Sequence, residues 1–203
     1  MSVEVQGLGG VIKRITDLGK QARFAAAQAC NDTAKEAQTF TTGTLLPEKF
    51  TLRSRGAPWF KPGTRMGFNI KFANKETLEA TMGSAADWLK LQEEGGTKKR
   101  SGRLAIPTLD LKPKAAVLSR SRKPKRLLEQ KKGFVIKLKK SGEAAIFERF
   151  GKAKKDIRPL YWLTPTAQIH AAFHFFETNK NLVELRFPQN FAKRFAVALA
   201  TSK

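Results

Sequence analysis

The sequence predicts an α+β fold, in which a long N-terminal helix packs on an antiparallel sheet of about four strands, with C-terminal helices and a basic extended insertion. Apolar and small residues recur at helical spacing over residues 10–40, and two later stretches alternate apolar with polar residues. Of the 203 residues, 41% are hydrophobic, which is enough for a core without disulfides. We therefore expect residues 1–203 to form a single α+β domain.

The first element is a long helix, expected from Gly10 to about Phe40. We expect it to end at Gly43, or at Pro47 at the latest, because a proline disrupts the hydrogen bonds of a helix interior. Its alanines would let a neighbouring element approach closely. The residues of its apolar stripe are Val11, Ile15, Leu18, Ala22, Ala25, Ala29, Thr33, Ala37 and Phe40.

A first hairpin and a short helix follow. Residues 68–72 and 78–82 alternate apolar with polar side chains around a turn at Asn74-Lys75, which predicts two antiparallel strands. Residues 85–93 predict a short helix, and the glycines at 95 and 96 end it.

The C-terminal part predicts a second hairpin and two helices. Residues 134–138 and 146–150 alternate in the same way around a turn at Ser141-Gly142. Thr164-Pro165 predicts a helix start, with Thr as the N-cap and Pro in the first turn, and with apolar residues along one face as far as Phe176. A last helix is expected from about Gln189.

Positive charge is concentrated in one segment. The chain has 39 Lys and Arg against 17 Asp and Glu, a formal net charge of +22, and residues 97–158 hold 21 of the basic and 5 of the acidic residues. Because such blocks of like charge repel one another, we expect residues 97–133 to form a basic loop or arm. A short extended piece is expected at residues 104–107. Candidate contacts with DNA or an acidic partner are Lys98, Lys99, Arg100, Arg103, Arg120, Arg122, Lys123, Lys125 and Arg126.

The sequence leaves three interpretations of these basic residues open. They could contact nucleic-acid phosphates, dock on acidic protein neighbours, or cover a solvated loop. No aromatic residue lies between Thr97 and Gly133, so a nucleic-acid contact there would be directed at the backbone and insensitive to base sequence.

Catalytic chemistry has little support. His170 and His174 lie four residues apart on a predicted helix, with Glu177 one turn later, and this spacing could hold a metal ion. The favoured alternative is that the histidines cover the polar side of that helix, because no supporting ligand is evident. Cys30 is the single cysteine, which excludes a disulfide framework. We expect no catalytic, cofactor or metal site, and a protein that is not an enzyme.

Membrane attachment is not expected either. The first residues lack the basic start and apolar run of a signal peptide, and no stretch approaches the ~20 apolar residues of a membrane span. We expect a soluble protein that folds in a reducing cytoplasm, with no membrane partner.

Three stretches, in order, resemble one group of proteins. The first is Ala-Cys-Asn-Asp-Thr-Ala at 29–34, in the long helix. The second is Leu-Gln-Glu-Glu-Gly-Gly-Thr at 91–97, followed by Leu-Ala-Ile-Pro at 104–107. The third is Ile-Phe-Glu-Arg-Phe-Gly-Lys at 146–152, followed by Ile-Arg-Pro-Leu-Tyr at 157–161. Together they resemble the minor tail protein Z group of tailed bacteriophages, which is related to the tail-completion proteins of the head–tail neck.

The resemblance implies a non-enzymatic structural virion protein that completes the tail at the head–tail junction as a ring of copies. Implied partners are further copies of the chain, a tail terminator, tail tube or head-completion protein, and, through non-specific contact, genomic DNA. Its place would be the virion tail or neck, after assembly in the host cytoplasm. The alternative function is sequence-independent nucleic-acid binding by residues 97–158.

The family motifs also imply structural roles for particular residues. Asn31 would bond across to the adjacent loop, and Gly95, Gly96 and Gly151 would form backbone turns. The full set of motif residues is Asn31, Gly95, Gly96, Pro107, Phe147, Arg149, Gly151, Lys152, Pro159 and Tyr161.

Overall fold

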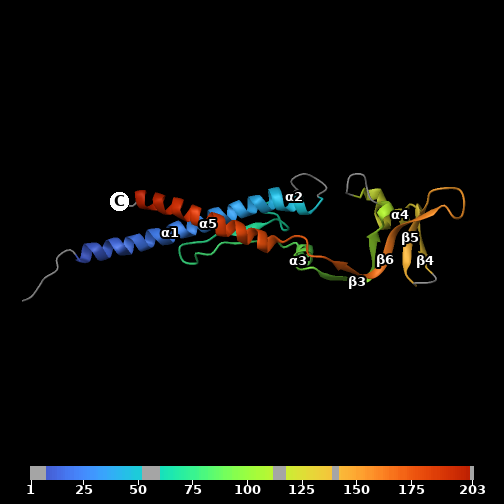
Figure 1. Ribbon diagram of the computed structural model, residues 1–203, viewed down its shortest axis with the longest axis horizontal. Coiled ribbons are helices and arrows are strands. Elements are labelled where there is room, and N and C mark those ends of the chain that lie inside the picture. Colours follow the sequence, from blue (N-terminus) through green and yellow to red (C-terminus); the bar gives the residue numbers. More distant parts are fainter. Residues whose placement is uncertain (1–7, 52–59, 112–117, 139–141, 202–203) are drawn as a thin grey trace, which may run out of the picture. The chain divides into compact units, whose positions relative to one another are not determined.

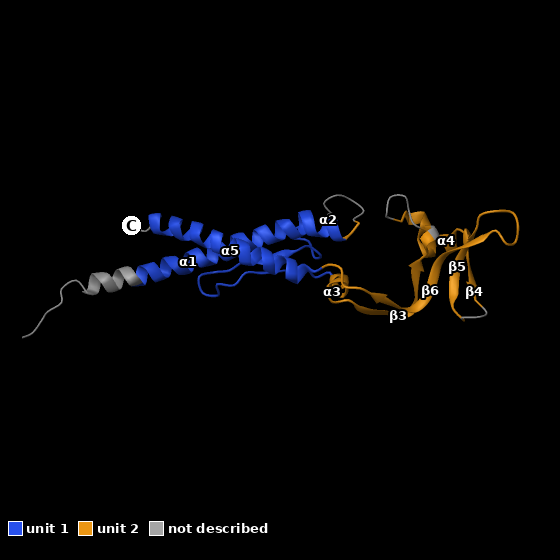
Figure 2. Ribbon diagram, viewed as in Figure 1, with its two compact units in different colours: residues 1–49, 54–86, 174–203 blue, residues 50–53, 87–173 orange. Residues whose placement is uncertain are grey.

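A computed structural model describes residues 8–51, 60–111, 118–138 and 142–201, and it confirms the α+β class (Figure 1). Where the sequence predicts one domain, residue contacts gather in two compact units (Figure 2). Unit 1 comprises residues 1–49, 54–86 and 174–203, and unit 2 comprises residues 50–53 and 87–173.

Unit 1 begins with the long helix that the apolar spacing predicts. Helix α1 (Leu8–Phe40) continues without a break into a π-helical turn, η1 (Thr41–Leu45), and then into α2 (Leu46–Lys49). The expected end at Gly43 or Pro47 is therefore wrong. The physical reason is the wide turn, in which the Leu46 N–H donates to the Thr41 carbonyl and so relieves the clash that a proline makes with the preceding α-helical turn.

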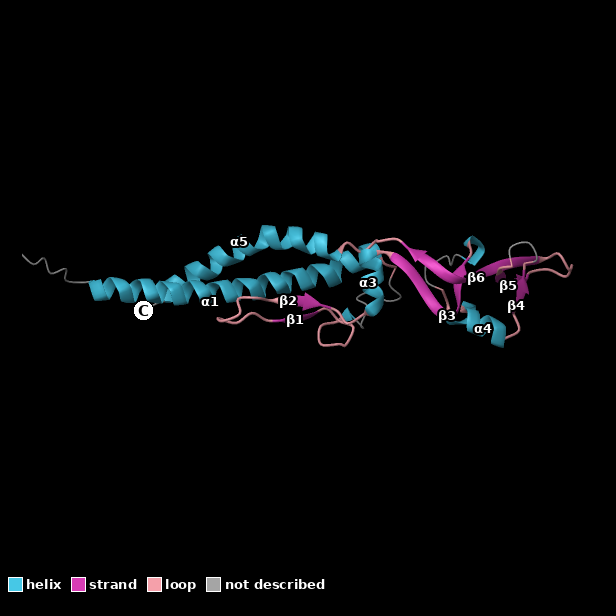
Figure 3. Ribbon diagram, turned by 90° about the horizontal axis from the view of Figure 1, so that it is seen from below, coloured by secondary structure: helices cyan, strands magenta, loops and turns pink. Residues whose placement is uncertain are grey.

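Helix α5 (Phe175–Thr201) lies antiparallel along α1 (Figure 3). Residues of α1 and η1 at intervals of four are almost completely buried along α5: Ala25, Ala29, Thr33, Ala37 and Thr41. Small side chains at this spacing let the helix axes approach closely, as the predicted stripe requires. Polar contacts continue the interface: Asp32 accepts two hydrogen bonds from the Arg194 guanidinium, one of them at 2.9 Å.

The prediction of two C-terminal helices is wrong. The structure has one helix, and it runs through Pro188. A proline inside a helix costs about 3 kcal/mol. Here α5 makes contacts on both sides of that proline: Asn179 before it bonds with Thr41 of η1, and Asn190 and Arg194 after it bond with α1. These contacts hold both halves of the helix on one partner, which offsets the lost hydrogen bond.

The first hairpin is confirmed and rests on another side of α1. Strand β1 (Asn69–Lys71) pairs antiparallel with β2 (Thr81–Gly83), with Ile70 opposite Met82. The Asn31 amide donates to the Ala73 carbonyl at 3.0 Å and accepts from the Ala73 N–H at 2.7 Å. The expected bond from this helix-internal asparagine to the neighbouring loop is therefore present.

Unit 2 is built on a four-stranded antiparallel sheet of order β3-β6-β5-β4. The short helix α3 (Asp87–Glu94) precedes it, as predicted. The strands are β3 (Gly96–Pro107), β4 (Gly133–Lys137), β5 (Ala144–Arg149) and β6 (Ile157–Ile169). Strands β4 and β5 form the predicted second hairpin.

The predicted helix from Thr164 is wrong, because these residues belong to strand β6. Pairing of β6 with β3 outweighs the local Thr-Pro signal, which depends only on a cap and a compatible backbone angle. Pro165 lies opposite the irregularity between Lys99 and Leu104. A proline is tolerated there because the strand ladder does not need its missing N–H.

The expected basic loop over residues 97–133 is also wrong in the described part of the segment. It contains strand β3, the 3-10 turns η3 (Leu109–Leu111) and η4 (Arg120–Arg122), helix α4 (Pro124–Glu129) and the start of β4. Two leucines anchor it: Leu111 and Leu127 pack with Ile146, Leu160 and Tyr161 in the core of unit 2. The charges extend to solvent from an edge strand and a surface helix, so their repulsion does not prevent folding.

Candidate functional site

Four of the nine candidate contacts lie on β3, which is an outer strand of the sheet: Lys98, Lys99, Arg100 and Arg103. All four are exposed. Lys98 and Lys99 pair with Ala167 and Thr166, so their side chains point to opposite faces. The two arginines lie in the irregular part of the strand. Lysine and arginine on an outer strand also discourage pairing with another sheet, so their position has a structural explanation as well.

The other five candidates lie in the layer formed by η4 and α4, and the structure does not place all nine in one strand or helix. Lys125 and Arg126 both approach the Glu129 carboxylate, at 3.9 and 3.2 Å. The remaining seven candidates form no ion pair with any described residue. Their charge is therefore available to an anionic partner.

Tyr161 connects this basic layer to the sheet. Its hydroxyl donates to the Arg122 carbonyl at 2.7 Å, and its side chain is almost completely buried. Burial raises the pKa of the Tyr161 hydroxyl, and the nearby Arg122 charge opposes that rise. The motif tyrosine thus positions the backbone of η4 above the core.

Two of the three motif glycines lie in turns as expected, Gly95 directly after helix α3 and Gly151 between β5 and β6, whereas Gly96 is the first residue of strand β3. Gly95 and Gly96 have φ angles of +73° and +128°, in the region that favours glycine. Gly151 has a different reason: a Cβ there would lie 2.2 Å from a carboxylate oxygen of Asp156. That carboxylate accepts a hydrogen bond from the Ala153 N–H at 2.9 Å and closes the turn between β5 and β6.

The other motif residues also build the sheet. Phe147 is largely buried and stacks on Phe134, with ring centroids 6.4 Å apart. Arg149 donates to the Ala153 carbonyl at 2.8 Å, and the Pro159 carbonyl accepts from Thr108 at 2.7 Å. Pro107 lies opposite Tyr161, at the end of β3. Lys152 is exposed in the turn.

The histidines do not share a helix. His170 and His174 lie in the segment between β6 and α5, and His174 has a φ angle of 51°. The expected polar helix face is therefore wrong, because strand β6 extends to Ile169 and helix α5 begins only at Phe175. Among the residues that the structure describes, no group of three metal-ligating side chains comes together.

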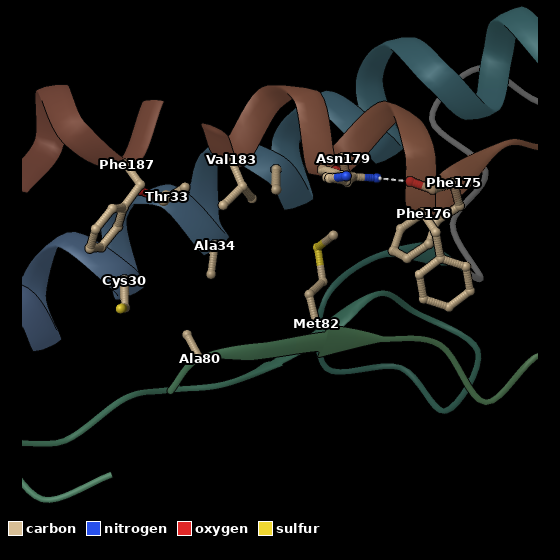
Figure 4. A pocket seen from close by; sticks show the side chains of 12 residues that line it. Cys30, Thr33, Ala34, Ala80, Met82, Phe175, Phe176, Asn179, Val183 and Phe187 are labelled. Carbon is tan, nitrogen blue, oxygen red and sulfur yellow. Dashed lines mark hydrogen bonds between the residues drawn. The ribbon is translucent and has the colours of Figure 1, made fainter. Parts of the chain in front are cut away.

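Sequence reasoning missed an apolar groove in unit 1, with a volume of about 300 Å³. Small residues of α1 form its floor, and β2 and α5 flank it; Val183, Met82 and Phe176 point into it (Figure 4). Its one buried amide, Asn179, accepts from the Thr41 hydroxyl and donates to the Phe175 carbonyl. The lining is Cys30, Thr33, Ala34, Ala37, Ala80, Met82, Phe175, Phe176, Asn179, Lys180, Val183 and Phe187.

The sequence signal for this groove is the helical spacing of Phe176, Val183 and Phe187. With α5 beginning at Phe175, this spacing places all three side chains on one face of the helix. The groove has the character of a surface for packing rather than for chemistry, because Lys180 is its only ionisable residue besides Cys30. Burial raises the pKa of the Cys30 thiol.

No helix in the described ranges is long and apolar enough to cross a membrane. Comparison of the chain with protein-family models, curated protein sequences and solved structures finds no match.

Proposed function

We propose that this protein is a non-enzymatic structural component of a bacteriophage virion, which completes the tail at the head–tail junction through ring-like contacts between copies. The observation that carries the proposal is the surface of α5. Three of its apolar side chains are mostly exposed: Phe176 by 70%, Leu185 by 61% and Val197 by 52%. A helix that is apolar on several sides is ordinarily covered by protein, and in the described part of the chain α1 packs along one side of α5 while β2 lies across the groove from another.

Two further observations support this proposal. The residues that carry the resemblance to tail proteins form helix contacts, turns and the core of the sheet. Such structural roles fit a protein that acts through its shape in an assembly. The groove beside α5 offers an additional apolar surface without a cluster of catalytic groups. Neighbours of the chain would be further copies and a tail terminator, tail tube or head-completion protein.

Light scattering after gel filtration tests the proposal on the full chain. We expect a concentration-dependent oligomer, and we expect the triple variant Phe176→Ser, Leu185→Ser, Val197→Ser to be a monomer with unchanged helical circular dichroism. Lys193→Ser, at an exposed polar position of the same helix, is the matched control and should assemble like the original chain. A chain that stays monomeric at all concentrations, or a triple variant that still assembles, would refute the proposal.

A second candidate function is sequence-independent nucleic-acid binding by residues 97–158. The seven candidate cations that form no ion pair with any described residue favour it, because lysine and arginine neutralise nucleic-acid phosphates and release their counterions. Such binding weakens with salt by about 0.9 logarithmic units per phosphate contact and per tenfold change in salt. Replacing Lys98, Lys99 and Arg100 by Ser should lower that slope by about 3 units if all three contact phosphate. An unchanged slope would exclude β3 from the contact.

A further inference from the structure

The two faces of the four-stranded sheet differ in what covers them. Ile146 and Tyr161 are opposite each other on β5 and β6, and both pack with Leu127 of α4. Neighbouring residues of a strand point to opposite faces, so Ala145, Phe147 and Trp162 point away from α4. The register then assigns Ile106 of β3 and Phe134 and Ile136 of β4 to the same side.

This side, which we call the aromatic face, consists of Ile106, Phe134, Ile136, Ala145, Phe147 and Trp162. Trp162 is 37% exposed, Phe134 36% and Ile106 37%. Phe147 fills the space beside Phe134, and its ring stacks there at 6.4 Å. The exposed rings are therefore supported by the pleated sheet, and they offer surface to a partner without protruding from a loop.

Basic residues lie at both ends of the aromatic face. Lys99 and Arg149 alternate onto the same side, at opposite ends of it, and Arg100 and Arg103 lie in the irregular part of the adjoining edge strand. No strand residue that points to this side, within the described ranges, is acidic. The one carboxylate of the central strands, Glu148, points to the other face and is paired with Arg158 at 2.9 Å.

We propose that the aromatic face binds single-stranded nucleic acid: unpaired bases stack on Trp162 and Phe134, and the basic residues at its two ends hold the phosphates. This inference rests on the nucleic-acid-binding candidate above and adds the class of ligand. The aromatic rings can stack on unpaired bases, and the nearby cations can contact the phosphates of the same strand. Stacking needs only the flat face of a base, so such binding is tolerant of sequence. A duplex keeps its bases stacked inside, and a second copy of so basic a surface would be repelled.

The structure supplies what the sequence did not. The aromatic residues lie outside the run from Thr97 to Gly133, where the basic candidates are concentrated, so the sequence predicted contact with the backbone alone. Antiparallel pairing brings Phe134 and Trp162 onto the same face as Lys99.

Fluorescence anisotropy with the full chain tests the proposal. The probes are a labelled single-stranded thymidine oligonucleotide, a labelled duplex of equal length, and polyglutamate as a competitor. The variants Trp162→Leu and Phe134→Leu keep an apolar side chain and remove the ring. Trp88→Leu is the matched control, because Trp88 is 40% exposed in the same unit, packs on Phe50 and lies outside the sheet.

We expect the single strand to bind more tightly than the duplex. Trp162→Leu should weaken single-strand binding by about 5- to 150-fold, the range expected for one lost stacking contact. Duplex binding should stay within about twofold for that variant, and Trp88→Leu should change neither, since the phosphate contacts are retained.

Four outcomes would overturn the inference. Equal losses on single strand and duplex mean that Trp162 acts through folding or general charge, while nucleic-acid binding itself survives. Competition by polyglutamate at equal charge concentration means a surface for acidic proteins. A change of oligomeric state in Trp162→Leu, measured by light scattering, means that a second copy covers this face. Failure of both probes to bind refutes the nucleic-acid-binding candidate as well.

Discussion

Replacing Asn31 by alanine tests how the first hairpin is held on the long helix. The side chain makes two hydrogen bonds with the backbone of Ala73, at 3.0 and 2.7 Å, and Ala73 is only 8% exposed. The substitution leaves one N–H and one carbonyl without partners, at about 1–3 kcal/mol each when buried. Water reaches this edge in part, and alanine is the better helix former by about 0.5 kcal/mol. We expect a net loss of about 2–3 kcal/mol in the stability of the hairpin on α1.

Hydrogen exchange measures this loss locally. Amides of residues 66–83 should exchange about 30- to 150-fold faster in Asn31→Ala, because every 1.4 kcal/mol is a factor of ten. Amides of β4 and β5 in unit 2 serve as an internal reference. Thr39→Ala is the matched control: its hydroxyl is exposed and bonds only to the Lys35 carbonyl of its own helix. Hairpin exchange that changes by less than about threefold, equivalent to about 0.6 kcal/mol, would refute the role assigned to Asn31.

Three further perturbations have expected outcomes. Tyr161 is the only tyrosine, so tyrosinate absorbance reports its titration alone. Its pKa should lie above the ordinary value of 10.0. The stability that the protonated hydroxyl contributes should therefore fall as the pH rises from about 10 through the raised pKa. Tyr161→Phe should lack this alkaline loss and be less stable by about 1 kcal/mol at neutral pH, measured by denaturant unfolding of unit 2. The hydrogen bond from the Arg194 guanidinium lowers the pKa of Asp32 below 3.8. This pair should therefore stabilise unit 1 above about pH 4 and lose its effect as the pH falls through the lowered pKa. An Asp32 pKa at or above its ordinary value, measured by NMR titration, would contradict this. Gly151→Ala should destabilise the β5–β6 turn by about 1–3 kcal/mol, since the Cβ displaces the Asp156 carboxylate, and pairing it with Asp156→Gly should recover part of the loss in thermal unfolding.

Local patterns determined the elements whose signals are repetitive. Small residues recur at helical spacing from Ala25 to Ala37, and apolar residues alternate with polar ones over residues 134–138. Each pattern is repeated several times, so several residues support the same secondary structure. The role of Asn31 could also be anticipated, because a polar residue within a stripe of small side chains needs a partner across the interface. The single signals failed: Thr164-Pro165 as a helix start, and Pro47 as a helix end.

The candidate site was predictable in composition and not in arrangement. The basic residues of 97–126 could be named from the sequence, and seven of them are without an ion pair among the described residues. Their distribution over an edge strand and a covering helix depends on pairing between residues far apart in the chain, such as Lys99 with Thr166. Like-charge repulsion suggested a loop, but Leu111 and Leu127 hold the segment on the core.

The sequence by itself determined the α+β class, the long helix, both hairpins and the position of the excess charge, because these follow from periodicity and composition along short stretches. Only the tertiary structure decided that β6 replaces a helix, that α5 continues through Pro188, and that aromatic rings and cations share one sheet face. Each of these features depends on contacts between residues that are distant in the chain. The free energy of those contacts outweighs the local conformational preference, and the contacts produce no periodic pattern in the sequence.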